Sequence, residues 1–282
     1  MVIADLRRNI ARRLALGGVP DAEFDADELI CFSLGLSRTK LALCFDREVT
    51  GDELSRLDLL ANRRLSGEPL QYIVGEWEFY GLPFYVGEGV LIPRADTEVL
   101  VDCALDFLKK RPSAKVIDLC SGSGCIAVSI KKNAPTADLT AVELYDPAFG
   151  YLEKNAKRNS ADIHAVRFDV LSEPNGFGEV DLIVTNPPYI EKGVIPTLSK
   201  EVNAEPITAL DGGDDGLDFY RAIAKNWLSL IKNGGCIMAE IGEEQASAVT
   251  RLFSEYGFSC TTEKDINRLD RVIIGTRKNG II

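Results

Sequence analysis

Short apolar segments recur from residue 114 to the end of the chain, and this recurrence constrains the fold more than any other feature. Five of them are rich in Val, Ile and Leu, as strands buried on both faces of a parallel sheet are: AKVIDLC (114–120), DLTAVEL (138–144), HAVRFDV (164–170), VDLIVTN (180–186) and GCIMAEIG (235–242). Helical stretches such as DFYRAIAKNWLSLI (218–231) lie between most of them, and FSCTTEKDI (258–266) and LDRVIIGTRK (269–278) can pair as an antiparallel end of the sheet. The pattern predicts an open, mostly parallel α/β sheet with ligands at the carboxyl ends of its strands.

The residues before this sheet divide into two further regions. Residues 1–68 read as helices, because apolar residues recur there at intervals of three and four, and the run from Thr50 to Glu53 resembles a capped helix start. Residues 69–113 form a linker in which Trp77–Phe79 and Phe84–Val86 flank Tyr80-Gly81-Leu82-Pro83 as a β-hairpin. We therefore expect a small helical domain (1–68), a hairpin linker (69–113) and a sheet domain (114–282).

Composition narrows the class of partner and the compartment. Lys and Arg number 32 and Asp and Glu 43, so the net charge of −11 argues against phosphate-backbone binding as the main source of affinity. The sequence shows no signal-peptide pattern and no apolar run long enough to cross a bilayer. Seven scattered cysteines form no CxxC pair and no metal-like cluster with the single histidine, His164. We expect a cytoplasmic protein without a bound metal or a membrane partner.

The first strand of the sheet region ends in a loop that suits an adenosine-containing cofactor. In DLCSGSGCIA (118–127), Gly122 and Gly124 allow a tight turn and a close approach of the backbone to a ligand. Glu143 follows at the tip of the second strand, where an acid can accept hydrogen bonds from two ribose hydroxyls. The letters also satisfy the dinucleotide fingerprint, so an NAD enzyme is an alternative.

Two features favour S-adenosylmethionine over NAD. Asp118 at the end of the first strand can receive the ammonium group of that cofactor, but it would face a pyrophosphate badly. The chain also offers no placed His or Lys for a hydride-transfer substrate. Asp169, at the end of the third strand, can accept from the adenine amino group while Val170 packs beside the ring; a turn cap is the alternative for Asp169.

The fourth strand ends in Asn186-Pro187-Pro188-Tyr189, and this tetrapeptide suits a planar NH2 group as methyl acceptor. The nitrogen lone pair of an amide or arylamine is delocalised, so the nitrogen is a poor nucleophile until it is oriented. The Asn186 side-chain oxygen and the Pro187 carbonyl can each accept one N–H bond and aim the nitrogen at the sulfonium methyl. The prolines stiffen the loop, and Tyr189 offers a face for stacking.

Enzymes that methylate adenine N6, guanine N2 or the glutamine side chain share NPPY, and the rest of the chain resembles one family among them. It is similar to the HemK/PrmC-type N5-glutamine methyltransferases of class I peptide chain release factors. The resemblance covers residues 65–278 and rests on these blocks: EPLQYIVGEWEFYG (68–81), VLIPRADTEVLV (90–101), DLCSGSGCIAVSI (118–130), NPPYI (186–190), EPITALDGGDDGLDFYRAI (205–223), AEIGEEQ (239–245) and LDRVIIG (269–275).

The resemblance implies a class I S-adenosylmethionine-dependent methyltransferase fold, with a Rossmann-like, mostly parallel seven-stranded sheet. It implies the glutamine of a Gly-Gly-Gln motif as acceptor, S-adenosyl-L-homocysteine as product, and a release factor docked on the helical domain and hairpin. The site residues it implies are, for the cofactor, Asp118, Cys120, Ser121, Gly122, Ser123, Gly124, Glu143, Asp169, Val170 and Asn186, and for the acceptor, Asn186, Pro187, Pro188, Tyr189, Arg94 and Phe79. For Arg94 an ion pair that holds the linker stays open, as does a place in the hairpin core for Phe79.

Three residues depart from the family pattern, namely Cys120 for a common Gly, Glu143 for a common Asp, and Tyr145 for a frequent Ser. None of them removes a needed donor or acceptor. Two alternatives also remain open: a methyltransferase for a ribosomal-protein glutamine or for an exocyclic base amine, and a non-catalytic cofactor-binding protein.

Overall fold

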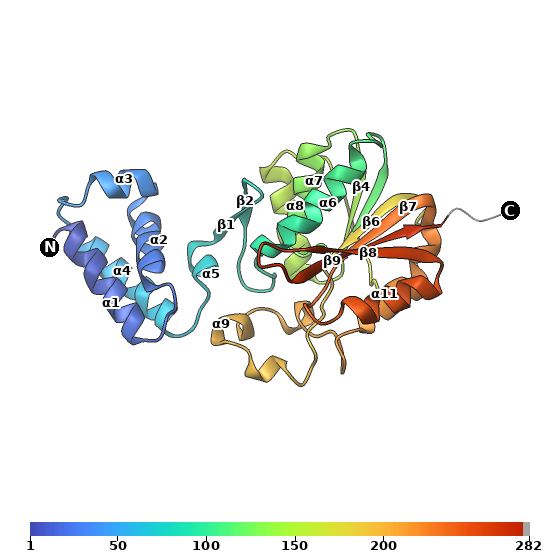
Figure 1. Ribbon diagram of the computed structural model, residues 1–282. Coiled ribbons are helices and arrows are strands. Elements are labelled where there is room, and N and C mark those ends of the chain that lie inside the picture. Colours follow the sequence, from blue (N-terminus) through green and yellow to red (C-terminus); the bar gives the residue numbers. More distant parts are fainter. Residues whose placement is uncertain (279–282) are drawn as a thin grey trace. The chain divides into compact units, whose positions relative to one another are not determined.

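The computed structural model describes residues 1–278, which form two compact units. The helical unit comprises Met1–Glu76 together with Ser199–Ala204, and the sheet unit comprises the remaining described residues. The helical unit contains α1 (Ile3–Leu16), α2 (Ala22–Leu34), α3 (Arg38–Leu43), α4 (Gly51–Leu65), α5 (Leu70–Val74) and the short α9 (Lys200–Asn203) (Figure 1). The sequence-based boundary at residue 68 falls between α4 and α5.

The helical unit is built on the apolar spacing seen in the sequence. Leu6, Ile10 and Leu14 are buried on one side of α1, and Leu57 of α4 is buried in the same unit. Thr50 caps α4, because its hydroxyl accepts from the backbone N–H of Glu53 while the Glu53 carboxylate accepts from the N–H of Thr50. The predicted start of this helix is confirmed.

A buried arginine fastens the late segment 199–204 to these helices. The Arg64 guanidinium donates to Asp25 of α2 at 2.5 Å and to Glu201 of α9 at 2.6 Å. The Arg64 side chain is 4% exposed, so removing one partner would leave a charge buried without compensation. Residues 137 positions apart in the chain thereby share one small core.

The sheet unit holds seven strands in the order β5-β4-β3-β6-β7-β9-β8. They are β3 (Lys115–Leu119), β4 (Asp138–Glu143), β5 (His164–Arg167), β6 (Val180–Thr185), β7 (Ile231–Glu240), β8 (Phe258–Lys264) and β9 (Asp270–Arg277). β9 runs antiparallel to both its neighbours, and the pairs from β5 to β7 are parallel. The predicted fold class is confirmed, including the antiparallel end of the sheet.

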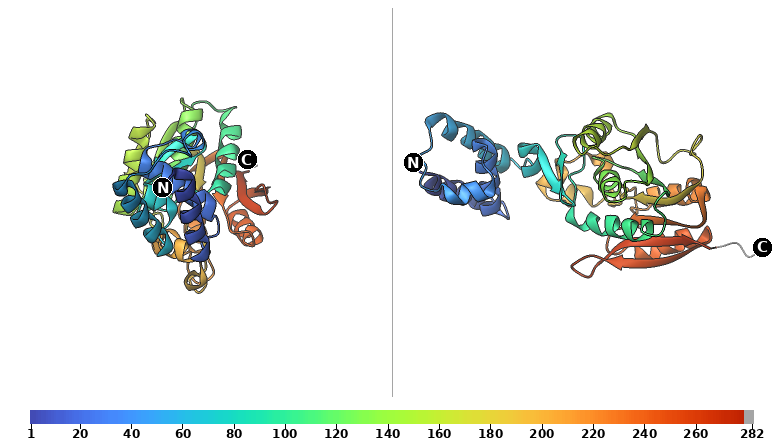
Figure 2. Two further views of the ribbon diagram at one scale, coloured as in Figure 1. Left: turned by 90° about the vertical axis from the view of Figure 1, so that its left-hand side faces the viewer. Right: turned by 90° about the horizontal axis from the view of Figure 1, so that it is seen from above.

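Helices cover both faces of this sheet (Figure 1 and Figure 2). One apolar core joins one sheet face to α6 (Glu98–Leu108), α7 (Cys125–Asn133) and α8 (Asp146–Arg158). The other core joins the opposite face to α10 (Asp218–Asn226) and α11 (Ala246–Glu255). In β3, Val116 belongs to the first core and Ile117 to the second, as the alternation of side chains along a strand requires. Short 3-10 helices complete the unit: η1 (Ala95–Thr97), η2 (Ile195–Thr197), η3 (Ile207–Ala209) and η4 (Leu228–Leu230).

The predicted hairpin is present, with a tighter turn than expected. β1 (Glu76–Phe79) and β2 (Leu82–Tyr85) pair around Tyr80 and Gly81, which both have positive φ. Leu82 and Pro83 therefore belong to the second strand and not to the turn. Two left-handed residues suit the two-residue connection whose twist matches that of the strands.

Three predicted element ends were wrong by several residues. The expected helix 218–231 ends at Asn226, because Trp227 begins a 3-10 turn and β7 starts at Ile231. β5 ends at Arg167, so Asp169 and Val170 lie in the following loop, where the Asp169 carboxylate accepts the N–H of Leu171 and turns the chain. β7 starts four residues earlier than predicted, across an irregularity in its pairing with β6.

Candidate active site

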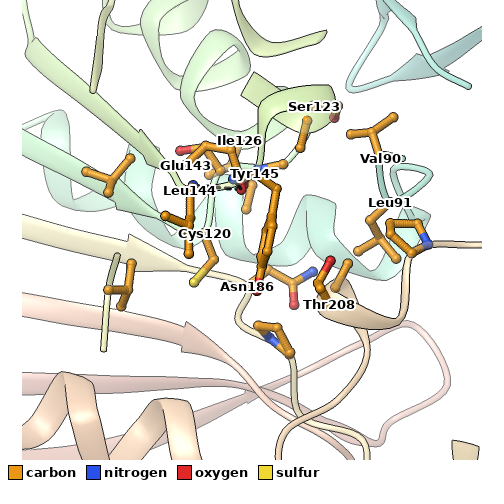
Figure 3. Close-up of a pocket in the computed structure, with 18 of the residues that line it drawn as sticks. Val90, Leu91, Cys120, Ser123, Ile126, Glu143, Leu144, Tyr145, Asn186 and Thr208 are labelled. Atoms are coloured by element: carbon orange, nitrogen blue, oxygen red, sulfur yellow. Dashed lines mark hydrogen bonds between the residues drawn. The ribbon is translucent and has the colours of Figure 1, made fainter. Parts of the chain in front are cut away.

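A pocket lies at the carboxyl edge of the sheet, where the strand order reverses between β3 and β6. It is lined by residues that follow β3, β4, β5 and β6, and by residues of the segments 89–97 and 206–209 with Phe219 (Figure 3). Open α/β sheets bind ligands at this switch point. Its charged lining residues are Arg94, Glu143 and Asp169.

The loop after β3 owes its shape to three left-handed residues. Cys120, Gly122 and Gly124 have φ of 58°, 54° and 80°. At Cys120 a side chain tolerates the conformation that glycine adopts without strain, which explains why glycine suits this position. At Gly124 a Cβ would lie 2.5 Å from Leu152 of α8, whereas at Gly122 it would meet nothing within 4 Å. Gly124 thus allows helix packing, and Gly122 serves the turn alone.

Glu143, at the end of β4, holds this loop through backbone hydrogen bonds. Its carboxylate accepts from the N–H groups of Gly122 at 2.8 Å, Leu144 at 2.8 Å and Tyr145 at 2.9 Å. The residue lines the pocket and is 7% exposed. A carboxylate has about four acceptor sites, so Glu143 keeps acceptor capacity for a ligand beside the loop.

Asp118 lies deeper than the pocket. Its side chain is fully buried, and neither carboxylate oxygen has a hydrogen-bond partner within residues 1–278. Burial raises the pKa of Asp118 to about 7, although the nearby Ser121 hydroxyl and the Ala127 backbone favour the charged form. Cys120, Ser121 and Ser123 line the pocket where Asp118 does not. The expected contact of Asp118 with a cofactor ammonium stays a prediction.

The loop after β5 is fixed from two sides. Asp169 lines the pocket, and its carboxylate accepts from the N–H of Leu171 at 2.9 Å. Val170 lines the pocket as well, and its carbonyl accepts from the indole N–H of the buried Trp227 at 2.9 Å. Both residues named for the adenine end therefore reach the pocket, with Asp169 also acting as a turn cap.

Asn186 stands at the end of β6, facing the pocket (Figure 3). Its side-chain nitrogen donates to the hydroxyl of Thr97 at 3.2 Å, which leaves its carbonyl oxygen as a free acceptor. Pro188 also lines the pocket, whereas Pro187 and Tyr189 are not among its lining residues. The expected stacking face of Tyr189 stays a prediction.

The Tyr189 side chain is instead held from β7 and the segment after it. Its hydroxyl donates to Glu240 at 3.4 Å, and its carbonyl accepts from the Gln245 side chain at 3.0 Å. Burial, followed by the charge of Glu240, raises the pKa of Tyr189 far above its usual range. At Gly212 a Cβ would lie 2.8 Å from the Tyr189 Cα, so this glycine allows two backbone segments to touch. The NPPY segment is thus rigidly supported.

Glu240 is a second deeply buried acid next to the pocket. It is 2% exposed, and burial raises its pKa to about 7 against the lowering effects of Thr97, Arg271 and Tyr189. The sequence showed it within the block AEIGEEQ but gave it no role. The signal in the sequence was an acidic residue at the end of an otherwise apolar strand, which could have marked Glu240 as a candidate site residue.

Arg94 and Phe79 serve structural contacts. Arg94 lines the pocket and pairs with the buried Glu205, whose other oxygen accepts from the N–H of Ile92 at 2.9 Å. Phe79 is 2% exposed and packs edge-on against Phe84 within the apolar core on the α6–α8 side of the sheet. Phe79 is absent from the pocket lining, so the structure places it in the hairpin core.

Two further observations concern membrane spans and metal ligands. Within residues 1–278, no helix has the length and apolar character needed to cross a membrane. In the same range, no three His, Cys, Asp or Glu side chains gather in a way that could hold a metal ion.

Solved structures with this fold define the class. A methyltransferase from Pyrococcus furiosus matches 80% of this chain and 98% of its own, with a TM-score of 0.54 and 17% identity. The hMettl16 catalytic domain in complex with MAT2A 3′UTR hairpin 6 matches 83% of this chain and 84% of its own, with a TM-score of 0.57 and 17% identity. The sheet unit thus has the fold that these methyltransferases share.

Sequence comparisons identify the family. Residues 5–75 match the family model of the PrmC N-terminal domain, and residues 96–210 match that of the methyltransferase small domain. The release factor glutamine methyltransferase of Geobacter sulfurreducens is 43% identical over 265 residues, covering 93% of this chain and 92% of the relative. Those of Thermodesulfovibrio yellowstonii and Aliivibrio fischeri are 40% and 38% identical, covering 89% and 96% of this chain and 91% and 95% of theirs. The chain belongs to the release factor glutamine methyltransferase family.

Proposed function

We propose that this chain transfers the methyl group of S-adenosylmethionine to the side-chain nitrogen N5 of a release-factor glutamine, in the Gly-Gly-Gln motif of class I peptide chain release factors. The observation that carries the proposal is the Asn186 carboxamide, held against Thr97 at the pocket with its oxygen free to accept. Family membership supports the same reaction.

The chemistry of the pocket lining fits S-adenosylmethionine better than a dinucleotide. Glu143 and Asp169 are acids, and the single cation of the lining, Arg94, is already paired with Glu205. A pyrophosphate would find no free positive charge among these side chains, whereas a cationic cofactor without phosphates would face acceptors. The unpartnered, buried carboxylate of Asp118 adds an acceptor behind the loop.

We assign the cofactor contacts on this basis. Glu143 would hold the ribose hydroxyls, Asp169 and Val170 the adenine, and the loop 120–124 the rest of the cofactor, with Asp118 behind this loop and Asn186 at the reacting end. When bound, S-adenosylmethionine supplies an electrophilic methyl group on a sulfonium.

The acceptor amide needs orientation more than a base. The Asn186 oxygen and the Pro187 carbonyl each accept one N–H of the glutamine amide, so that its nitrogen points at the methyl group. Transfer would break the S–CH3 bond as the N–C bond forms, with S-adenosylhomocysteine as the leaving group, and these two dipoles would stabilise the positive charge that develops on the glutamine nitrogen. One N–H proton then leaves to solvent, which restores the neutral amide. Positioning thus provides most of the rate.

The helical unit is the proposed docking element for the release factor, together with the hairpin. A small separate unit suits a protein substrate, which needs contacts beyond one side chain. The seven cysteines are free in the described residues, which is consistent with action in the reducing cytoplasm, where release factors work.

The test is transfer of labelled methyl from S-adenosylmethionine to a purified release factor, to ribosomes and to DNA in parallel. We expect label in the release factor alone, and mass mapping should place it on the glutamine of Gly-Gly-Gln. A release factor with alanine at that glutamine should stay unlabelled. Label only in nucleic acid or in a ribosomal protein would overturn the proposal, and cofactor binding without transfer to any acceptor would favour a non-catalytic role.

A further inference from the structure

Both polar side chains of the NPPY segment lead to one buried carboxylate. Asn186 donates to the Thr97 hydroxyl at 3.2 Å, and the Tyr189 hydroxyl donates to Oε1 of Glu240 at 3.4 Å. Thr97 lies beside the same carboxylate, and Thr97 and Glu240 are each 2% exposed. These contacts join η1, β6 and β7: Thr97 and Asn186 line the pocket, and Glu240 lies behind them.

When Glu240 is ionised, the hydrogen-bonding capacity of these groups fixes the direction of each bond. A hydroxyl has one proton and two lone pairs, and an ionised carboxylate only accepts. Oε2 of Glu240 has no hydrogen-bond partner among residues 1–278, and the Thr97 hydroxyl lies close enough to lower the pKa of Glu240. We infer that this hydroxyl turns its proton towards the carboxylate. Once its proton points at Glu240, Thr97 can only accept from Asn186. The Asn186 carboxamide must then turn its NH2 towards Thr97 and its oxygen towards the pocket.

The backbone of Glu240 and the charged groups around its carboxylate are themselves held in place. The Tyr220 hydroxyl of α10 donates to the Glu240 carbonyl at 2.7 Å. The positive charge of Arg271 in β9 favours the charged form of the carboxylate, and its guanidinium donates to Asp265 at 2.9 Å. Asp96, beside Thr97, is the opposing negative group. The end of β7 thus presents an acceptor in a fixed place.

We propose that Thr97 and Glu240 are positioning residues that fix the Asn186 carboxamide with its oxygen towards the methyl acceptor. This inference rests on the proposed function, and it explains why the enzyme would select an NH2 group as methyl acceptor. A reversed carboxamide would place two N–H donors against the N–H of the acceptor, so that the hydrogen bond to the acceptor would be lost.

Four variants test the path from Glu240 through Thr97 to Asn186, which is called the relay below. Thr97→Val removes the hydroxyl and keeps the branched shape, and Thr97→Ser restores the hydroxyl without the methyl group. Glu240→Gln offers an acceptor oxygen to only one of the two hydroxyls. Thr136→Val is the matched control, because its hydroxyl donates to the Pro112 carbonyl away from the pocket.

The kinetic readout is kcat for a release factor beside the dissociation constant for S-adenosylmethionine. We expect Thr97→Val to lower kcat by about tenfold or more, since a displaced reacting group costs up to about a hundredfold, while cofactor affinity stays close to that of the parent. Thr97→Ser should recover most of the rate, and Thr136→Val should match the parent. The double variant of Thr97→Val and Glu240→Gln should be no slower than the slower single variant, because both act through Asn186.

Several results would overturn the relay. Thr97→Val at the parental rate would do so, as would Thr97→Ser as slow as Thr97→Val, which would assign the effect to packing. A double variant whose loss is the product of the single losses would show separate roles.

A second readout needs no turnover. In nitrogen-15 spectra, the Asn186 side-chain NH2 signal is assigned by its loss in Asn186→Ala. We expect slower hydrogen exchange of this group in the parent and in Thr97→Ser than in Thr97→Val and Glu240→Gln. Equal exchange in all four proteins would contradict the relay. If the parent methylates no release factor, the proposed function fails, yet this comparison still decides the orientation of Asn186.

Discussion

The two ends of the pocket are held in different ways. At the cofactor end, Glu143 accepts from backbone groups 1, 2 and 21 positions away, and Asp169 accepts from a backbone group two positions away. At the acceptor end, Asn186 bonds to Thr97 across 89 positions, and Tyr189 bonds to Glu240 and Gln245 across 51 and 56. One end is fixed mainly by its own loops, and the other by side chains from distant elements.

Because of this difference, the two ends should respond differently to substitutions. Backbone donors survive most substitutions, so the cofactor end depends on a few acids and on the glycines that shape its loops. Side-chain partners are lost by single substitutions, so the acceptor end should lose turnover while its fold and cofactor affinity persist. The variants below test this contrast.

The largest expected effect is at Asn186. Asn186→Ala should lower kcat by about 10²–10³-fold, as loss of a preorganised polar group in a transition-state site does, because the acceptor amide loses its holder. Calorimetry should find cofactor binding retained. Asn133→Ala, whose side chain bonds within α7, is the control. Near-normal turnover of Asn186→Ala would contradict the mechanism.

Glu143→Ala should lower the affinity for the cofactor more than it lowers kcat. We expect cofactor affinity to fall by about 10–100-fold, the equivalent of losing hydrogen bonds to a charged group, because the ribose hydroxyls and three backbone N–H groups lose their acceptor. Titration calorimetry measures this, with the exposed Glu153→Ala as control. An unchanged dissociation constant would remove Glu143 from the cofactor site.

The glycines of the cofactor loop should differ from one another. Gly124→Ala should lower the free energy of unfolding by more than Gly122→Ala, since both have positive φ but only Gly124 would press a Cβ onto Leu152. We expect about 1 kcal/mol for the conformational cost at Gly122 and about 1–3 kcal/mol more at Gly124 for overpacking. Urea unfolding compares the two. Equal losses of unfolding free energy in the two variants would show that α8 shifts to accommodate the added Cβ at no cost.

The smallest effect is expected at the Tyr189 hydroxyl. Tyr189→Phe should lower kcat by about fivefold, in line with the roughly 1 kcal/mol of one neutral hydrogen bond, and leave cofactor affinity unchanged. Steady-state kinetics with the release factor measure this. A loss as large as that of Asn186→Ala would give the hydroxyl a direct role in the reaction.

Prediction from sequence succeeded where the determinants are local. The succession of strands and helices, the capped start of α4 and the loop 118–127 each depend on residues within a few positions of one another. Asn186, Glu143, Asp169 and Val170 were therefore placed at the pocket from their positions after strands. Element ends were less predictable: the indole of Trp227, just after α10, bonds to Val170 57 positions away, and the turn at Asp169 ends β5 earlier than its apolar residues suggest.

Where burial or distant partners decide, the sequence left alternatives open or assigned no role. Nothing local shows that Asp118 is fully covered, or that Phe79 packs into a core that includes Phe84 and α6. The pairing of Arg94 with Glu205 joins residues 111 positions apart, and the contact of Thr97 with Asn186 joins residues 89 apart. Spacing within a segment carries no information on such pairs, so Glu240 and Gln245 received no role from the sequence, and Thr97 received only a place in the family-like block VLIPRADTEVLV.

A crystal structure of the chain with S-adenosylhomocysteine and a release factor would test the central claim most directly. The account predicts that the glutamine nitrogen lies within hydrogen-bonding distance of the Asn186 oxygen and on the sulfur side of the cofactor, with the Asn186 NH2 on Thr97. A glutamine bound elsewhere, with Asn186 and the two prolines facing solvent, would contradict it.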